Sequence, residues 1–190
     1  MKKSLFMQDS WHSNHGYEAM LDFQMSWLMR LAAENNIEKP LLHKISKDVL
    51  LRLLEIDNEG KQNVEIVKVE VWRQWKSIDV VAEVTIKVNG LIEQHLVVIE
   101  DKAYTMVHNN QLTRYRQTVE ETYGDTRKPH YWLITFFDEN QKNKYEALKA
   151  DCDIANWNFL SFYDVIGWKD GEFPDTESDL FNEFWLREWY

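Results

Sequence analysis

The sequence predicts a single α/β domain in which helices are followed by three antiparallel strands, a crossover helix and a fourth strand. Two stretches before residue 60 repeat apolar residues at helical spacing, and three stretches between residues 64 and 102 have strand character. A further helical stretch leads to an apolar run at residues 131–137, and a strand–helix–strand connection favours parallel pairing. At 190 residues the chain can bury a core of its own, so we expect one domain over residues 1–190.

Two amphipathic helices are expected at the start of the chain. Residues 14–35 carry one apolar stripe, and Pro40 is suited to open a second helix because its fixed φ fits a first turn. Asn58-Glu59-Gly60 should end the second helix. The apolar faces consist of Tyr17, Met20, Leu21, Trp27, Leu28 and Leu31 in the first helix and Leu42, Ile45, Val49, Leu53 and Ile56 in the second.

Three strands are expected at residues 64–75, 78–88 and 91–102. Asn89-Gly90 is a strong signal for a two-residue hairpin between the second and the third. The third strand becomes continuously apolar at residues 96–99, which indicates burial on both faces at the centre of the sheet.

A helix at about residues 107–123 and a strand at residues 131–137 should complete the core, and an accessory tail follows at residues 156–190. The tail contains a short edge strand at residues 158–162 and a capping pattern at residues 176–179 that begins a last helix. That helix would carry an aromatic stripe of Phe181, Phe184, Trp185 and Trp189.

Charged residues interrupt the apolar strands at two places. Asp79 lies in the second strand, and Glu100-Asp101-Lys102 ends the third; alternation points Glu100 and Lys102 to one face and Asp101 to the other. Buried strands exclude such charges unless they are paired or bind metal. Two carboxylates and a lysine at neighbouring strand ends can hold a divalent cation and activate a water on it.

These residues resemble the signature of the PD-(D/E)XK nuclease superfamily, which is an Asp, a gap, an acidic-x-Lys triplet and often a Gln-x-x-x-Tyr on the next helix. Asp79, Glu100 and Lys102 match the signature, although Ile78 replaces its usual proline. Gln111 and Tyr115 match the extension; they are four residues apart and therefore share a helix face. The sequence of this segment looks most like an uncharacterised bacterial branch of the superfamily that has IExK followed by QxxxY. The resemblance covers about residues 64–137.

The resemblance implies a restriction-endonuclease-like αβββαβ core with a mixed central sheet flanked by helices, and a Mg²⁺-dependent endonuclease that hydrolyses phosphodiester bonds of DNA. Asp79 and Glu100 would hold Mg²⁺ or Mn²⁺, with the backbone carbonyl of Asp101 as a further ligand. We expect Lys102 to position the attacking water and stabilise charge, because nearby carboxylates oppose the lowered pKa that a lysine base needs.

Supporting roles follow from the same resemblance. Gln111 and Tyr115 would touch the site lysine or the substrate backbone, and Arg114 would contact phosphate, whereas the ordinary alternatives are a solvated glutamine, a core tyrosine and a surface arginine. Many members add a glutamate, for which Glu18 in the first helix and Glu70 in the first strand are the alternatives.

The composition restricts the function further. A net charge of −10 opposes a broad nucleic-acid surface, so only a modest basic groove is expected. The single Cys152 excludes an intrachain disulfide and, with no signal peptide or membrane span in the sequence, indicates the cytoplasm. The six histidines show no zinc-site spacing. The alternative function is a non-catalytic nuclease-fold module that binds a protein partner or forms a homodimer through the aromatic C-terminal helix.

Overall fold

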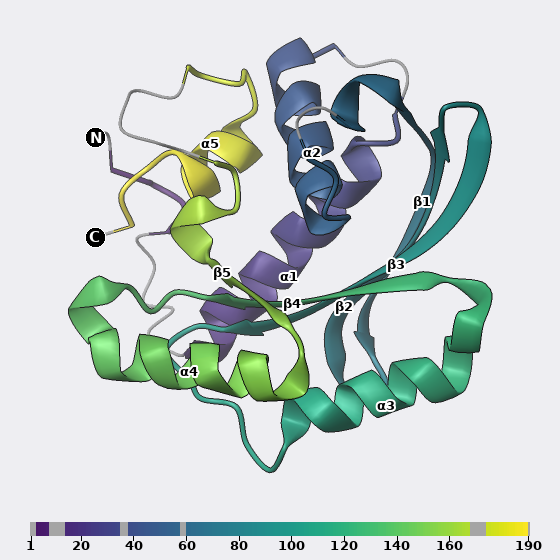
Figure 1. The fold of residues 1–190 in the computed structure, drawn as a ribbon. Helices are drawn as coiled ribbons and strands as arrows, with labels where there is room; N and C mark the ends of the chain where they lie inside the picture. The colour runs from purple at the N-terminus through teal and green to yellow at the C-terminus, as the bar shows by residue number, and fades with distance from the viewer. Residues whose placement is uncertain (1–2, 8–13, 35–37, 58–59, 168–173, 190) are drawn as a thin grey trace.

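A five-stranded mixed sheet forms the centre of the molecule, and helices cover both of its faces (Figure 1). This computed structural model describes residues 3–7, 14–34, 38–57, 60–167 and 174–189. The strand order is β1-β2-β3-β4-β5, with antiparallel pairing among the first three and parallel pairing of β3 with β4 and β4 with β5. The strands are β1 (Val64–Trp75), β2 (Ile78–Val88), β3 (Leu91–Lys102), β4 (Lys128–Thr135) and β5 (Asn158–Ser161). The predicted fold class is confirmed.

Helices α1 and α2 cover one face of the sheet, together with α5, and helices α3 and α4 cover the other (Figure 1). Each face therefore has its own apolar cluster, and the sheet separates the two. The α-helices are α1 (Asn14–Leu31), α2 (Pro40–Leu53), α3 (Gln111–Tyr123), α4 (Lys142–Ala155) and α5 (Asp179–Trp185). Short 3₁₀ turns occupy Gly60–Asn63, Gly124–Thr126, Glu139–Gln141 and Phe162–Asp164. Among the described residues, no helix combines the length and apolar character that a bilayer span requires.

Turn chemistry fixes the register of the three antiparallel strands. Asn89 and Gly90 both have positive φ, at 49° and 87°, which is the conformation of a two-residue turn that matches the strand twist. Lys76 and Ser77 adopt the same conformation between β1 and β2, at 50° and 69°. The predicted hairpin is thus confirmed, and the apolar segment at residues 96–99 is buried on both faces of the sheet as expected.

Several predicted boundaries differ from the structure. Helix α3 begins at Gln111 instead of residue 107 because Asn109 and Asn110 have left-handed φ values of 50° and 54°. Strand β4 begins at Lys128 and ends at Thr135, earlier than predicted at both ends. Helix α2 ends at Leu53, while residues 35 and 58–59, where predicted helix ends fell, lie outside the described residues.

Two features of the C-terminal half were predicted wrongly or missed. Helix α4 was missed because only three of its fourteen residues are buried, which leaves a weak apolar stripe. Helix α5 is capped by Ser178, whose hydroxyl accepts from the Phe181 N–H, and does not start from Thr176. The Thr176 hydroxyl instead donates to the Asn182 side chain at 2.8 Å, so it holds the loop before the helix.

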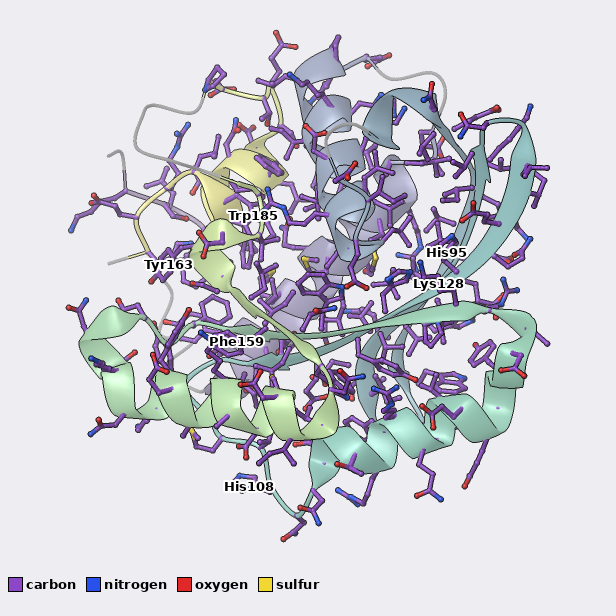
Figure 2. The ribbon with its side chains drawn as sticks, in the orientation of Figure 1. His95, His108, Lys128, Phe159, Tyr163 and Trp185 are labelled. Atoms are coloured by element: carbon purple, nitrogen blue, oxygen red, sulfur yellow. The ribbon has the colours of Figure 1, made fainter. Side chains whose placement is uncertain are left out.

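The aromatic stripe of the C-terminal helix belongs to the core. Phe184 and Trp185 are only 1% and 5% exposed, and Figure 2 shows Trp185 on α5. The Trp185 ring stacks on Phe162 with centroids 5.0 Å apart. Trp189 stacks on Tyr17 of α1 at 5.5 Å. The Phe184 and Trp185 side chains are covered by the chain's own core and present little exposed surface to a partner. A homodimer or a protein partner stays a prediction, and its contact surface would have to consist of other side chains.

Two histidines that are distant in sequence meet inside the sheet. His95 of β3 and His130 of β4 are both buried, and their rings face each other with Nδ1 of His95 2.9 Å from Nε2 of His130. The outer ring nitrogens contact Glu93 at 3.1 Å and Glu55 at 2.6 Å. Burial lowers the pKa of each histidine, although the neighbouring glutamates oppose this.

The histidine pair should make the fold sensitive to acid. Because the pKa values of His95 and His130 are lowered in the folded state, the unfolded chain binds more protons below about pH 6.5, so stability falls as the pH falls through that region. We expect His130→Gln to show a smaller loss of unfolding free energy than the wild type between pH 7.5 and 5.5 in urea titrations. His108→Gln, at an exposed site, is the matched control and should lose as much unfolding free energy over this pH range as the wild type. If His130→Gln also lost as much as the wild type, the buried histidine pair would not be the cause of the acid sensitivity.

Candidate metal centre

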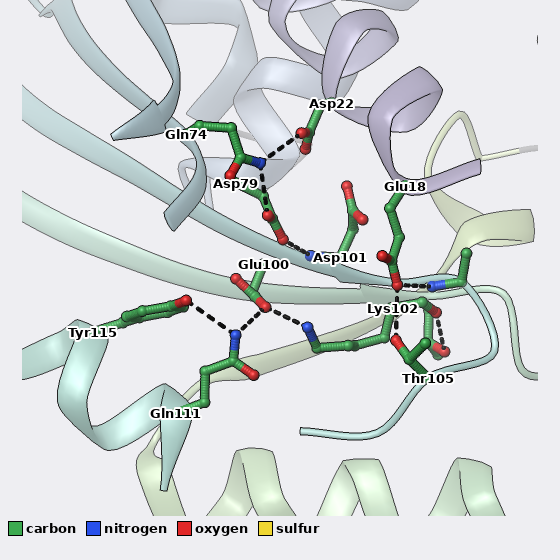
Figure 3. A network of polar contacts seen from close by, with 12 residues as sticks. Glu18, Asp22, Gln74, Asp79, Glu100, Asp101, Lys102, Thr105, Gln111 and Tyr115 are labelled. Carbon is green, nitrogen blue, oxygen red and sulfur yellow. Dashed lines mark hydrogen bonds and ion pairs between the residues drawn. The ribbon is translucent and has the colours of Figure 1, made fainter. Parts of the chain in front are cut away.

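The signature residues gather at the carboxyl end of β3, between α1 and α3 (Figure 3). Side-chain alternation sends Glu100 and Lys102 toward α3 and Asp101 toward α1. All three side chains are buried, so the strand presents charge to both faces at a point where the sheet is otherwise apolar.

Asp79 lies between these two groups of residues. Its Oδ2 accepts the backbone N–H of Asp101 at 2.9 Å, which ties the start of β2 to the end of β3. Its Oδ1 accepts from the Gln74 amide at 3.0 Å, and the same amide donates to Asp22 Oδ2 at 3.1 Å. The Asp79 carboxylate is thereby held with one Gln74 amide and one backbone N–H as its donors.

On the α3 side, Glu100 is the centre of a hydrogen-bonded chain. Its Oε1 accepts from Lys102 Nζ at 2.5 Å and from Gln111 Nε2 at 2.6 Å. Gln111 also donates to the Tyr115 hydroxyl at 3.0 Å, so these two residues share a helix face as expected. Gln111 reaches the glutamate and not the lysine, and both helix residues therefore serve to orient Glu100.

The charge balance of this side favours a bound cation. Burial raises the pKa of Glu100 to about 9, and the charge of Asp79 adds to the effect while Lys102 opposes it. Burial lowers the pKa of Lys102, but the carboxylates of Glu100, Asp79 and Glu18 outweigh burial, and the net direction is upward. Lys102 thus stays an ammonium ion, which suits charge stabilisation and not proton abstraction.

On the α1 side, three aspartates converge. Asp22, Asp79 and Asp101 each offer a carboxylate oxygen, and these oxygens all lie within 4.8 Å of one another. Burial and the charge of Asp79 raise the pKa of Asp22 to about 6 and raise the pKa of Asp101 well above its ordinary value. The sequence reading missed Asp22; its signal was its position one helical turn after Glu18, on the same face of α1.

Of the two candidate glutamates, the structure places only Glu18 near the signature residues. Glu18 lies at the end of β3, where its Oε1 accepts from the Ala103 N–H at 3.0 Å and from the Thr105 hydroxyl at 2.7 Å. Glu70 instead forms an exposed ion pair with Lys68 on β1, at 2.8 Å. Glu18 is thus beside the carboxylate cluster, and Asp22 enters the cluster itself.

The oxygens around this centre fit a hard divalent cation. Buried oxygens of Asp22, Glu100 and Asp101 have no hydrogen-bond partner among the described residues. Mg²⁺ and Mn²⁺ prefer carboxylate oxygens, and a cation would satisfy atoms that are costly to bury alone.

An αβββαβ core that brings an Asp, an acidic-x-Lys triplet and a Gln-x-x-x-Tyr helix to one edge of the sheet defines the restriction-endonuclease-like class of proteins. The family model described as the PD-(D/E)XK nuclease superfamily matches residues 22–175, and the chain belongs to this superfamily. Searches of curated proteins and of solved structures return no significant match. The matched region extends beyond residues 64–137 and includes Asp22.

Proposed function

We propose that the protein is a nuclease that hydrolyses DNA phosphodiester bonds with Mg²⁺ or Mn²⁺. The observation that carries the proposal is the buried carboxylate cluster at the end of β3, in which Asp79 and Glu100 flank a protonated Lys102. Membership of a nuclease superfamily supports hydrolysis as the class of reaction.

Each residue of the centre has a role in this reaction. Asp79 and Glu100 would hold the cation, which when bound lowers the pKa of water and offsets phosphoryl charge. Lys102 would orient the attacking water and stabilise the negative charge that develops on the phosphoryl oxygens. Gln111 and Tyr115 are positioning residues, because they act on the substrate through Glu100.

Local basic groups support a nucleic-acid substrate despite the acidic chain. Arg73 and Lys76 lie on the β1–β2 hairpin next to Asp79, and the Arg73 guanidinium stands 5.7 Å from the Phe23 ring centroid. Arg114 is exposed on α3, one turn after Gln111. The Lys76 ammonium also donates to the Thr122 hydroxyl of α3 at 2.8 Å. These cations would suit phosphate contacts with a narrow stretch of backbone, in keeping with the modest groove expected from the sequence.

A cleavage assay tests the proposal. Purified protein is incubated with supercoiled, linear and single-stranded DNA and with RNA, in Mg²⁺ or in EDTA. We expect Mg²⁺-dependent DNA cleavage that falls by about 10²–10³-fold in Asp79→Asn, because transition-state charge loses its stabilisation. Glu65→Gln, an exposed carboxylate at the far end of β1, is the control and should cleave normally.

Undiminished cleavage by Asp79→Asn would contradict the proposal. If no substrate is cleaved although the protein binds Mn²⁺, the alternative function as a non-catalytic interaction module is favoured, and a search for a protein partner becomes the next experiment.

A further inference from the structure

An aromatic ring and a cation lie next to the carboxylate cluster on its α1 side. Phe23 follows Asp22 directly in α1, and the Arg73 guanidinium of β1 lies over the Phe23 ring, 5.7 Å from its centroid. Gln74, the residue after Arg73, donates to both Asp22 and Asp79 (Figure 3). The Phe23–Arg73 pair is therefore held beside the metal centre by its sequence neighbours on both elements.

The β1–β2 hairpin carries a second aromatic–cation pair, on the α3 side. The Lys76 ammonium lies 4.9 Å from the centroid of the Trp75 ring, and Trp75 packs against Tyr123 of α3 with ring centroids 5.7 Å apart. Trp72 lies on the same side, because it pairs in register with Val81, which belongs to the apolar cluster under α3. Aromatic and basic side chains therefore line both sides of the hairpin next to the metal centre.

Two of these rings are open to solvent. Phe23 is 41% exposed even though Arg73 contacts it, and Trp72 is 40% exposed on the edge strand β1. Every other tryptophan that the structure describes is buried or half-buried. A single exposed ring is ordinary on a protein surface, but exposed rings beside cations and beside a catalytic centre offer flat apolar faces where a substrate arrives.

The charge of the chain limits the form of nucleic acid that this surface can hold. Affinity for a duplex comes mainly from neutralised phosphates, and a chain with a net charge of −10 provides few cations for that purpose. An unpaired strand exposes the faces of its bases, and every base can stack on an aromatic ring whatever its sequence. Exposed rings beside two cations therefore suit a single strand better than a duplex.

We propose that Phe23 and Trp72 stack unpaired bases and thereby make single-stranded DNA the substrate class of this centre. Arg73 and Lys76 would bind phosphates of the same strand; the bond from Lys76 to Thr122 uses one of the three ammonium donors, so the others can reach a phosphate. The strand would cross the hairpin from the α1 side to the α3 side and pass the metal centre between them. The inference rests on the proposed function, while binding of a single strand can be measured without turnover.

DNA binding by stacking variants tests the proposal. Fluorescence anisotropy of a short labelled DNA strand, alone and annealed to its complement, gives both dissociation constants at one salt concentration with Ca²⁺ as the divalent cation. We expect the wild type to bind the single strand more tightly than the duplex. Phe23→Leu and Trp72→Leu should each weaken single-strand binding by about 5–100-fold, because leucine keeps an apolar side chain but has no flat ring.

Phe6→Leu is the matched control, since Phe6 is an equally exposed phenylalanine whose N–H is held by Glu183 of α5, and it should bind DNA as the wild type does. Both stacking residues are exposed, so their variants should keep the fold, which circular dichroism checks. Unchanged single-strand binding in both variants, a duplex bound as tightly as the single strand, or no binding of either by the wild type would overturn the stacking site. Failure of the nuclease proposal is a different result, namely ring-dependent binding of the single strand with no cleavage in Mg²⁺.

Discussion

The Lys102→Ala variant is expected to lose DNA cleavage by about 10²–10³-fold and yet to bind Mn²⁺ more tightly than the wild type. Lys102 places a positive charge 2.5 Å from Glu100 Oε1, where it competes with a divalent cation for the same carboxylate. Removing the ammonium frees that oxygen and leaves the local charge more negative, so the affinity for a cation should rise. The transition state would meanwhile lose the stabilising positive charge of the Lys102 ammonium, whose pKa the neighbouring carboxylates raise.

Cleavage rates and calorimetric Mn²⁺ titrations on the same preparations separate the two effects. Lys149→Ala, on the exposed surface of α4, is the control and should change neither quantity. Retained cleavage in Lys102→Ala would remove Lys102 from the catalytic set. Weaker Mn²⁺ binding would mean that the lysine organises Glu100 for the metal and does not compete with it.

Phe184→Ala is expected to lower the free energy of unfolding by about 3–5 kcal/mol, the usual cost of emptying a large buried aromatic site. The Phe184 ring is 1% exposed and packs edge-on against Trp185 and Phe162, with centroids 4.9 and 5.7 Å away. The cavity would open between α5 and the 3₁₀ turn at Phe162–Asp164 that follows β5.

Urea unfolding followed by tryptophan fluorescence measures this change. Leu180→Ala is the matched control, because Leu180 lies on the same helix but is 36% exposed, and it should cost no more than about 1 kcal/mol. A Phe184→Ala variant as stable as the wild type would contradict the placement of this ring in the core.

Local rules were sufficient to predict the three antiparallel strands. The bounds of β1, β2 and β3 agree with the sequence reading residue for residue, because alternation and the Asn89-Gly90 turn act over a few neighbouring residues. Helix α4 could not be predicted in this way, since most of its surface is exposed and its sequence has little apolar period. The left-handed residues Asn109 and Asn110 likewise displaced the start of α3.

Only the part of the candidate site that follows from the geometry of a single strand could be predicted from the sequence. The opposite directions of Glu100 and Asp101 follow from the pleat of a single strand. The approach of Asp22 depends on how α1 is rotated against the sheet, and side-chain packing decides that rotation. The contact of His95 with His130 similarly depends on the parallel register of β3 and β4, in which Val97 pairs with His130.

The acidity of the chain has a partial explanation in this arrangement. Five carboxylates, those of Glu18, Asp22, Asp79, Glu100 and Asp101, gather at one end of the sheet. A divalent cation bound there would offset two negative charges, so a net charge of −10 overstates the negative charge that a nucleic acid would meet at the site.

The rate of DNA cleavage as a function of Mg²⁺ concentration, in the wild type beside Asp79→Asn/Glu100→Gln, tests the metal-dependent nuclease most directly. The account predicts a rate that rises from zero and saturates with Mg²⁺ in the wild type and stays at background in the double variant. A rate independent of Mg²⁺, or the same curve for both proteins, would contradict it.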